Sequence, residues 1–495
     1  MKLKIGRFYC LNHMDLKQWC QLDEQIYIAQ SDERYKQYAG LTYNERIIER
    51  LADMRTISAE TFVNFFSQPR ELVISSLDNI ADSSTKKLEL HLYKLRNEKI
   101  ISSHYKFSGA PVNWSTWRQF NSIEKDPKRR KHVFDEFISK TRYISPVIKE
   151  RFDKMDRVYR QYSDNKLTPL EGYLKNEKIS YNHLIDFVKS VGRRARKPFQ
   201  EALQSISKKV LGRNAEYYDD FYFFRNRIYA NLAKEFAGIS PPQQVRRTLA
   251  KMQFDLSSIH IDMEQRKNKY PSPICFFIQV PNDIKILYKS ESPYFDLQGC
   301  YHEMGHAVHA SSISAQAEFW NRYNFSMGIA EIFSIFLERL TKNRGYLSSL
   351  GVRNNDILDE IQAKNNFMDL FFITFYAANS LMKAEFWYEK LSMEKASDAY
   401  AQLIKEYTGF EMPGEYWMLH HILPDAIMYV PSYLIAAVRA AELDHHLQNE
   451  FGEKWWNEVE AGKYIREIME PGAKIDLSRF SRLDSSLFLN ELIDD

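Results

Sequence analysis

Hydrophobic and polar positions recur with a helical period along most of this chain, in long runs rich in Leu, Lys, Glu and Tyr. Gly and Pro, which interrupt helices, number only 17 and 16 in 495 residues. One predicted helix covers residues 214–236, because it has an acidic first turn and Gly238 follows it. Ser240 and Pro241 then predict the N-cap and first position of the next helix. The pattern therefore predicts a mainly α-helical protein.

A short β-rich pattern interrupts these helices. Residues 274–280 (ICFFIQV) and 283–289 (DIKILYK) are β-branched and aromatic runs on either side of Pro281 and Asn282. Two such runs joined by turn residues predict a β-hairpin. An edge strand of a hairpin can hold an extended peptide by backbone hydrogen bonds. We expect this hairpin to have either that role or a purely structural one.

Residues 328–340 (GIAEIFSIFLERL) are apolar at almost every position, which predicts a helix that is buried nearly all round. Glu331, Ser334 and Glu338 form a polar stripe along it, at steps of three and four residues. A carboxylate in such apolar surroundings needs a charged partner or a metal ion. This helix is therefore a candidate for a functional site.

The segment at 302–306 reads HEMGH, a match to HExxH. A step of four residues turns through about 400° on a helix, so His302 and His306 share one face. Two imidazoles so placed can bind one Zn²⁺, and Glu303 is positioned to act as a general base. A catalytic zinc needs a third protein ligand, which Glu331 supplies. The alternative, a helix with two surface histidines, does not explain the buried Glu331.

Neighbouring residues narrow the type of zinc site. The metzincin pattern needs glycine at 309 and histidine at 312, where this chain has His309 and Ser312. We expect His309 to hydrogen-bond near the site without binding the metal. Cys300, two residues before the first histidine, is expected to be a small buried residue that faces away from the metal.

Residues 302–309 (HEMGHAVH) and 330–338 (AEIFSIFLE) together resemble the thimet oligopeptidase and oligoendopeptidase F family of zinc metallopeptidases. Members of that family carry HExGHxxH and a glutamate ligand in an AExxSxxxE helix at a similar separation. The clear resemblance covers residues 272–340, a weaker echo covers 420–440, and the first 200 residues show none.

The resemblance implies a gluzincin-type site with one Zn²⁺ per chain, bound by His302, His306 and Glu331. Glu303 would be the general base and acid in hydrolysis of a peptide bond. It also implies a mainly α-helical bowl with a deep substrate channel and a small β-element beside the HExxH helix. Such a channel would admit short unfolded oligopeptides and exclude folded proteins.

The weaker echo implies three further catalytic residues. Family members have a histidine here, followed within about a dozen residues by tyrosines that reach the scissile carbonyl. Tyr433 is the first choice and Tyr429 the second, with His421 as the imidazole, and each would stabilise the oxyanion, by roughly 3 kcal/mol. The chain departs from the family in that Pro431 interrupts the run and His420 competes with its neighbour for one role.

Charge and composition exclude several classes of partner. The chain has 68 basic and 65 acidic side chains, a net charge of +3, so no strong field attracts nucleic acid or an anionic membrane. We expect the basic runs at 125–132 and 193–197 to be solvated. The densest apolar stretch, residues 370–378, is about half the length that spans a bilayer. Four widely spaced cysteines and an N-terminus without a signal-peptide pattern suggest a cytoplasmic protein.

We expect a soft boundary near residue 180, between an N-terminal helical region (1–180) that forms one wall of a cleft and a catalytic region (181–495). The first functional hypothesis is a zinc endopeptidase that cleaves oligopeptides. The second is a metallocarboxypeptidase of the helical HExxH type, which needs a basic group for the terminal carboxylate; Arg225, Arg227 and Arg322 are unplaced candidates. The third is a non-enzymatic helical peptide-binding protein with a structural metal, although three ligands would leave one coordination position open.

Overall fold

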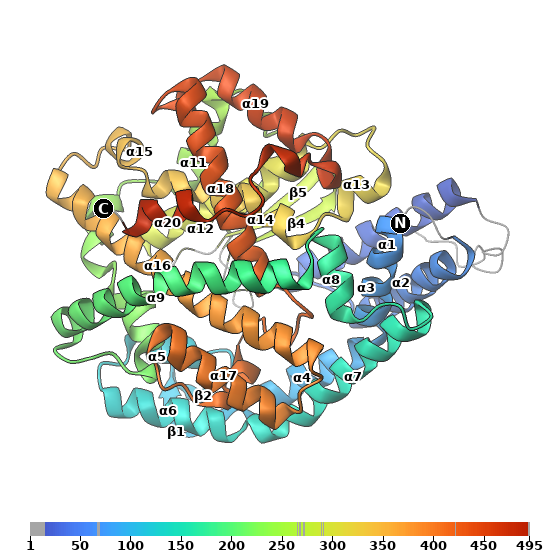
Figure 1. Ribbon diagram of the computed structural model, residues 1–495, viewed down its shortest axis with the longest axis horizontal. Helices are drawn as coiled ribbons and strands as arrows, with labels where there is room; N and C mark the ends of the chain where they lie inside the picture. Colours follow the sequence, from blue (N-terminus) through green and yellow to red (C-terminus); the bar gives the residue numbers. More distant parts are fainter. Residues whose placement is uncertain are drawn as a thin grey trace.

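The computed structural model describes residues 15–66, 70–264, 266, 269–270, 273–288, 290, 292–420 and 422–493. The protein is mainly α-helical with a small sheet, which confirms the predicted fold class (Figure 1). The helices of the N-terminal half are α1 (Leu16–Tyr38), α2 (Glu45–Phe65), α3 (Arg70–Ser84), α4 (Lys86–Lys99), α5 (Trp117–Ile123), α6 (Pro127–Ser139), α7 (Ser145–Tyr162), α8 (Pro169–Asn176), α9 (Tyr181–Leu211), α10 (Ala233–Phe236) and α11 (Pro241–Lys251).

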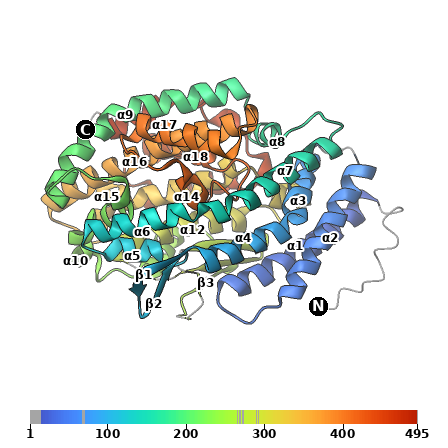
Figure 2. The same ribbon diagram turned by 90° about the horizontal axis from the view of Figure 1, so that it is seen from below.

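The helices of the C-terminal half follow the small sheet. They are α12 (Pro293–Ser312), α13 (Phe319–Tyr323), α14 (Met327–Arg339), α15 (Arg344–Ser349), α16 (Asn355–Tyr388), α17 (Met393–Thr408), α18 (Val430–Phe451), α19 (Val459–Met469) and α20 (Ser486–Ile493). Both views show α12 and α14 in the interior, while α1, α2 and α3 form one flank of the molecule (Figures 1 and 2). No helix of the described residues combines the length and apolarity needed to cross a bilayer.

Local chemistry explains where the long helix α9 begins and ends. The side chain of Ser180 accepts a hydrogen bond from the His183 backbone N–H and caps the first turn. Gly212 ends the helix in the left-handed conformation, at φ 71°, which costs glycine little. Its apolar face, which includes Phe187 and Val191, packs against α16, which α9 crosses in Figure 1.

Among the described residues, five strands form two sheets. β4 (Ile274–Gln279) and β5 (Asp283–Leu287) make the predicted antiparallel hairpin, and β3 (Ile259–Asp262) pairs in parallel with β5. The strand order β3-β5-β4 leaves β4 at an edge. A second hairpin, β1 (Ile101–Phe107) and β2 (Ala110–Asn113), lies beside α5 and α6. β1, β2 and β3 lie outside the predicted hairpin and complete the β-structure of the described residues.

The prediction of one continuous helix over residues 214–236 is wrong. The segment consists of a 3-10 turn, a π-helical stretch at Phe221–Arg227, a second 3-10 turn and the short α10. Phe221, Phe223, Phe224 and Tyr229 are all buried, and these positions point in several directions around a regular α-helix. A wider, irregular backbone can bury all four rings. The next helix does begin at Pro241, as predicted.

The expected boundary near residue 180 falls between α8 and α9. One cluster of buried side chains runs across it, from Ala59 to Leu492. The division into residues 1–180 and 181–495 stays a prediction.

The carboxylate of Asp262, at the end of β3, accepts hydrogen bonds from several donors around it. Lys269 Nζ lies 3.0 Å from its carboxylate, the Tyr35 hydroxyl donates at 3.0 Å, and Arg266 forms an ion pair with it. The Lys269 side chain is fully buried. Burial alone would raise the pKa of Asp262, but these donors hold the pKa below its usual value.

Replacing Asp262 with Asn is expected to lower the free energy of unfolding by about 3 kcal/mol, because Lys269 then stays buried without a counter-charge. The folded pKa of Asp262 lies below the unfolded one, so the carboxylate stabilises the fold above about pH 4 and loses this effect as pH falls through the folded pKa. The gap in stability between wild type and Asp262→Asn should therefore narrow on acidification. Urea unfolding at neutral and acid pH measures this difference in the free energy of unfolding, and the exposed Asp153→Asn is the control. A difference that does not change with pH would contradict the prediction.

Candidate metal centre

Helix α12 presents His302, Glu303 and His306 because α12 and α14 pack backbone against backbone. A Cβ built on Gly305 would lie 2.2 Å from the Phe333 carbonyl oxygen, closer than any side chain tolerates. Only glycine therefore permits this approach. The contact brings Glu331, on α14, beside the two histidines of α12.

Three donor groups converge at this contact. Glu331 Oε2 lies 3.4 Å from His302 Nε2 and 3.5 Å from His306 Nε2, and the two imidazole rings are 5.0 Å apart. One donor atom from each residue lies within 4.8 Å of the other two. Two imidazoles and one carboxylate are the ligand types of a gluzincin-type zinc site, so the residues present fit a divalent ion. The predicted set of His302, His306 and Glu331 is together in space.

The charge states suit a cation. Burial would raise the pKa of Glu331, but His306, His302 and a hydroxyl donor outweigh it and hold that pKa at about 2. The Glu331 side chain is only 2% exposed, so an ionised carboxylate there needs these partners. Burial raises the pKa of the neighbouring Glu303, and the His302 and His306 imidazoles only partly oppose the shift.

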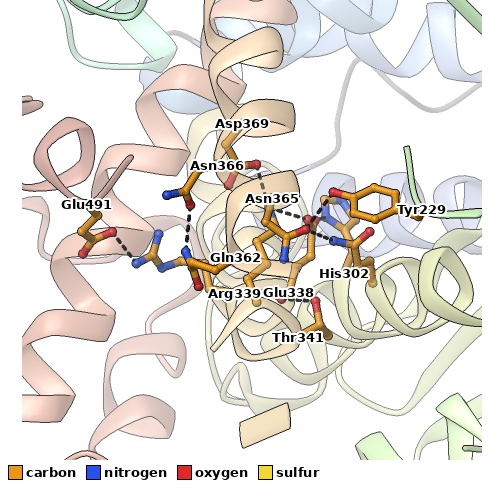
Figure 3. Close-up of polar contacts among 12 residues, drawn as sticks. Tyr229, His302, Glu338, Arg339, Thr341, Gln362, Asn365, Asn366, Asp369 and Glu491 are labelled. Carbon is orange, nitrogen blue, oxygen red and sulfur yellow. Dashed lines mark hydrogen bonds and ion pairs between the residues drawn. The ribbon is translucent and has the colours of Figure 1, made fainter. Parts of the chain in front are cut away.

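A carboxylate on α14 orients the first histidine. Glu338 Oε2 lies 3.0 Å from His302 Nδ1, and Lys342 joins Glu338 to Asp369 at 3.2 and 2.8 Å (Figure 3). Because an ionised carboxylate can only accept, Nδ1 donates to Glu338, and in the neutral ring Nε2 would be the nitrogen available to a metal ion. Burial opposes ionisation of Glu338, but Lys342 and His302 lower its pKa to about 2.

Further polar contacts lie around this network (Figure 3). The Ser334 hydroxyl donates to Glu331 Oε2 at 2.8 Å. Tyr229 donates to Asn365 Oδ1 at 2.8 Å, and Arg339 pairs with Glu491 at 2.7 Å (Figure 3). The polar stripe on residues 328–340 had already singled out Ser334 and Glu338 from the sequence. No sequence signal pointed to the partners on α16 or on the irregular segment before α10.

Glu338→Gln is expected to weaken metal binding by about 10- to 100-fold, because an amide replaces the carboxylate that orients His302. The side chains have nearly the same volume, so we expect the melting temperature of the metal-free protein to change little. Competition with a chelating dye measures the affinity. Glu394→Gln, an exposed change on α17, is the matched control; equal affinity in all three proteins would contradict the orienting role.

The two predicted tyrosines lie at the start of α18, Tyr429 as its N-cap and Tyr433 in its first turn. The Tyr429 hydroxyl donates to Glu331 Oε1 at 2.6 Å. The Tyr433 ring lies 5.2 Å from that of Tyr429 and stacks on Tyr376, also at 5.2 Å. Both predicted tyrosines are therefore beside Glu331. Their contact with a substrate carbonyl stays a prediction.

A buried carboxylate at the C-cap of α8 links α14 to α18. Glu177 accepts hydrogen bonds from the Gly328 backbone N–H at 2.8 Å and the Ser326 hydroxyl at 2.9 Å, at the start of α14. The Ser432 hydroxyl of α18 donates to the same side chain at 3.2 Å. Glu177 thus sets the distance between the helix that carries Glu331 and the helix that carries the tyrosines.

The loop before α18 is anchored by buried donors. Lys383 donates to the Leu423 carbonyl at 2.6 Å, and Trp387 donates to the Ile427 carbonyl at 2.9 Å. His420 is buried, and its Nδ1 accepts backbone N–H groups of Ile422 and Leu423 at 3.1 and 3.3 Å, so it organises this loop. The predicted catalytic His421 lies outside the described residues.

The other residues singled out near the site have structural surroundings. The expectation that His309 hydrogen-bonds is not met: it is fully buried against Phe325 and Phe333, and among the described residues neither ring nitrogen has a hydrogen-bond partner. Burial lowers its pKa to about 3, so the ring is a neutral packing element. Cys300 is buried, as predicted. Arg322 is held by Glu24 at 2.6 Å.

Strand β4 runs along the centre. The Cys275 backbone N–H hydrogen-bonds to Glu303, and the Phe277 ring lies 6.5 Å from the His306 ring. Since β4 is an edge strand, this N–H points away from β5 and toward α12. The edge that lacks a strand partner therefore faces the candidate base.

Comparisons with known proteins match the part of the chain that carries this centre. The sequence model of peptidase family M3 matches residues 243–469, which include α12, α14 and α18. No curated protein matches the chain in sequence.

Solved peptidase structures share the fold at low sequence identity. PZ peptidase A has a TM-score of 0.59 at 15% identity, over 96% of this chain and 85% of its own. An assigned oligoendopeptidase F from Bacillus anthracis str. Ames has a TM-score of 0.56 at 16% identity, over 97% and 84%. An M32 carboxypeptidase from Deinococcus radiodurans R1 has a TM-score of 0.60 at 13% identity, over 97% and 95%. The resemblance in the motifs at 302–309 and 330–338 is confirmed, and the comparisons support an M3-like metallopeptidase.

Proposed function

We propose that the protein is a zinc-dependent endopeptidase that hydrolyses internal peptide bonds of short unfolded oligopeptides. His302, His306 and Glu331 would hold the ion, with one position left for water or substrate. The observation that carries the proposal is the approach of all three donors to within 4.8 Å of one another, with Glu303 beside them on α12. Family M3 similarity supports the peptidase class, and the non-enzymatic alternative has no comparable support.

The chain's own residues supply the remaining chemistry. His302, His306 and Glu331 would hold a divalent ion, which would supply Lewis-acid chemistry and promote ionisation of water. Glu303 would take a proton from the attacking water and pass it to the departing amine. Tyr433 and Tyr429 would donate to the oxyanion, as would His421. The free edge of β4 would hold the substrate as an added strand.

A second candidate function is a metallocarboxypeptidase, which the fold shared with an M32 carboxypeptidase favours equally. That reaction needs a basic group for the terminal carboxylate. Arg322 is engaged by Glu24 and by the Val280 carbonyl, so it does not supply this group.

Internally quenched peptides blocked at both ends separate these functions. An endopeptidase should cleave them and lose activity with a chelator. A carboxypeptidase should cleave only peptides with a free C-terminus and release single residues in order, which mass spectrometry detects. Metal analysis of the same preparation should find about one zinc per chain at this site; failure to cleave any peptide with metal bound would refute both functions.

The two tyrosines should differ when each is changed to Phe. Tyr433→Phe is expected to lower kcat by about 100-fold through loss of an oxyanion donor, with metal affinity unchanged. Tyr429→Phe should also weaken metal binding, because Glu331 Oε1 loses the hydrogen bond that the Tyr429 hydroxyl donates to it at 2.6 Å. Kinetics at saturating zinc, together with zinc competition, separate the two effects. The exposed Tyr93→Phe is the control, and a fully active Tyr433→Phe enzyme would remove this residue from the mechanism.

A further inference from the structure

A second group of metal donors lies far from α12 and α14, on β1 and α6, which sit at the bottom of the view in Figure 1. It consists of His104 on β1 and of His132 and Glu136 on α6. One donor atom from each lies within 4.8 Å of the other two. His104 Nδ1 is 3.8 Å from Glu136 Oε2, and the two imidazole rings are 4.8 Å apart.

The backbone places these three groups together. His132 and Glu136 are four residues apart on α6, so they share one face of the helix. β1 packs against α6 and turns His104 toward that face. An exposed helix would not by itself bring a second imidazole to this point.

The carboxylate is held in a fixed orientation. Glu136 Oε1 accepts from the Ser103 backbone N–H and hydroxyl at 2.8 and 2.9 Å, and Oε2 accepts from the Ser102 hydroxyl at 2.8 Å. The Tyr105 hydroxyl lies 3.3 Å from His132 Nδ1, which leaves the other ring nitrogen for a ligand. Metal ligands typically have such outer partners.

We propose that His104, His132 and Glu136 form a second divalent transition-metal site that clips the β1–β2 hairpin to α6. Two imidazoles with one carboxylate favour Zn²⁺, Co²⁺, Ni²⁺ or Cu²⁺ over Mg²⁺ and Ca²⁺, which prefer oxygen ligands. His104 is 60% exposed, so water completes the coordination. Lys140 lies 3.3 Å from Glu136 and opposes a second cation, so binding is weaker than at the catalytic centre.

The test is a zinc titration of the full-length protein whose catalytic centre is already loaded. Wild type should bind a second equivalent of Zn²⁺, and the melting temperature should rise with added zinc because only the folded state holds the site. His104→Ala and His132→Ala should each weaken this second binding at least about 10-fold and abolish the rise in melting temperature. The exposed His445→Ala, on α18, is the control and should behave as wild type.

Two results would overturn the proposal. One is a single zinc equivalent in wild type up to about 1 mM added metal, the weakest affinity that would still define a site. The other is a second equivalent that persists unchanged in both His104→Ala and His132→Ala. Neither result bears on the catalytic centre, because its loading and the peptidase activity are measured separately in the same preparations.

Discussion

Glu303→Gln is expected to lower kcat/KM by about 1000-fold while one metal ion stays bound. The amide has nearly the same shape as the carboxylate but can neither accept the proton of the attacking water nor return it to the leaving amine. Glu303 is not part of the donor set formed by His302, His306 and Glu331, so the ion should keep its ligands. Hydrolysis of a quenched peptide and metal analysis of the same sample measure both quantities.

Glu303→Asp is the matched variant for this prediction. It keeps the carboxylate but shortens its reach by one methylene group, so activity between wild type and Glu303→Gln is expected. Full activity of Glu303→Gln with bound metal would remove this residue as the base. Loss of metal from Glu303→Gln would show instead that the side chain supports the ligands.

Glu331→Gln is expected to release the metal and abolish activity, with affinity for zinc lowered by about 100-fold or more, because the site loses its single anionic ligand. The change also removes the buried charge that His302, His306 and Tyr429 surround. Dialysis against a weak chelator followed by metal analysis measures the loss. Added zinc in large excess should restore part of the activity.

Circular dichroism and melting of metal-free Glu331→Gln show whether its fold is retained. Glu394→Gln, an exposed change on α17, should keep both metal and activity. A Glu331→Gln protein that retains one zinc through dialysis would refute the proposed ligand set. Retention of metal without activity is the result expected for Glu303→Gln, so the two variants distinguish ligand from base.

The local sequence pattern was sufficient to predict the helices and the hairpin that carry the candidate metal centre. The helix of residues 302–309 and the buried helix at 328–340 are confirmed as parts of α12 and α14. The predicted hairpin is confirmed as β4 and β5, over residues 274–287; Lys289, at its predicted end, lies outside the described residues. Periodicity and turn chemistry act over a few neighbouring residues, so they can be seen without knowledge of the fold.

The local sequence pattern did not predict contacts between segments that are distant in the chain. Glu338 and His302 are 36 positions apart, and Tyr429 and Glu331 are 98 apart, yet both pairs are hydrogen-bonded. His309 faces two phenylalanine rings and not a polar partner, because α14 and the segment before it cover that side of α12. Periodicity tells which face of a helix is buried, but it does not tell what covers that face.

The sequence by itself determined the chemistry of the candidate centre: two imidazoles on one helical face, a base between them and a lone carboxylate on an apolar helix. Only the tertiary structure decided how these groups meet, through the close approach at Gly305, the Glu338 carboxylate behind His302 and the Glu177 link between α14 and α18. The physical reason is that helical periodicity is a property of neighbouring residues. The approach of two helices depends on side chains that are distant in sequence and become neighbours only on folding.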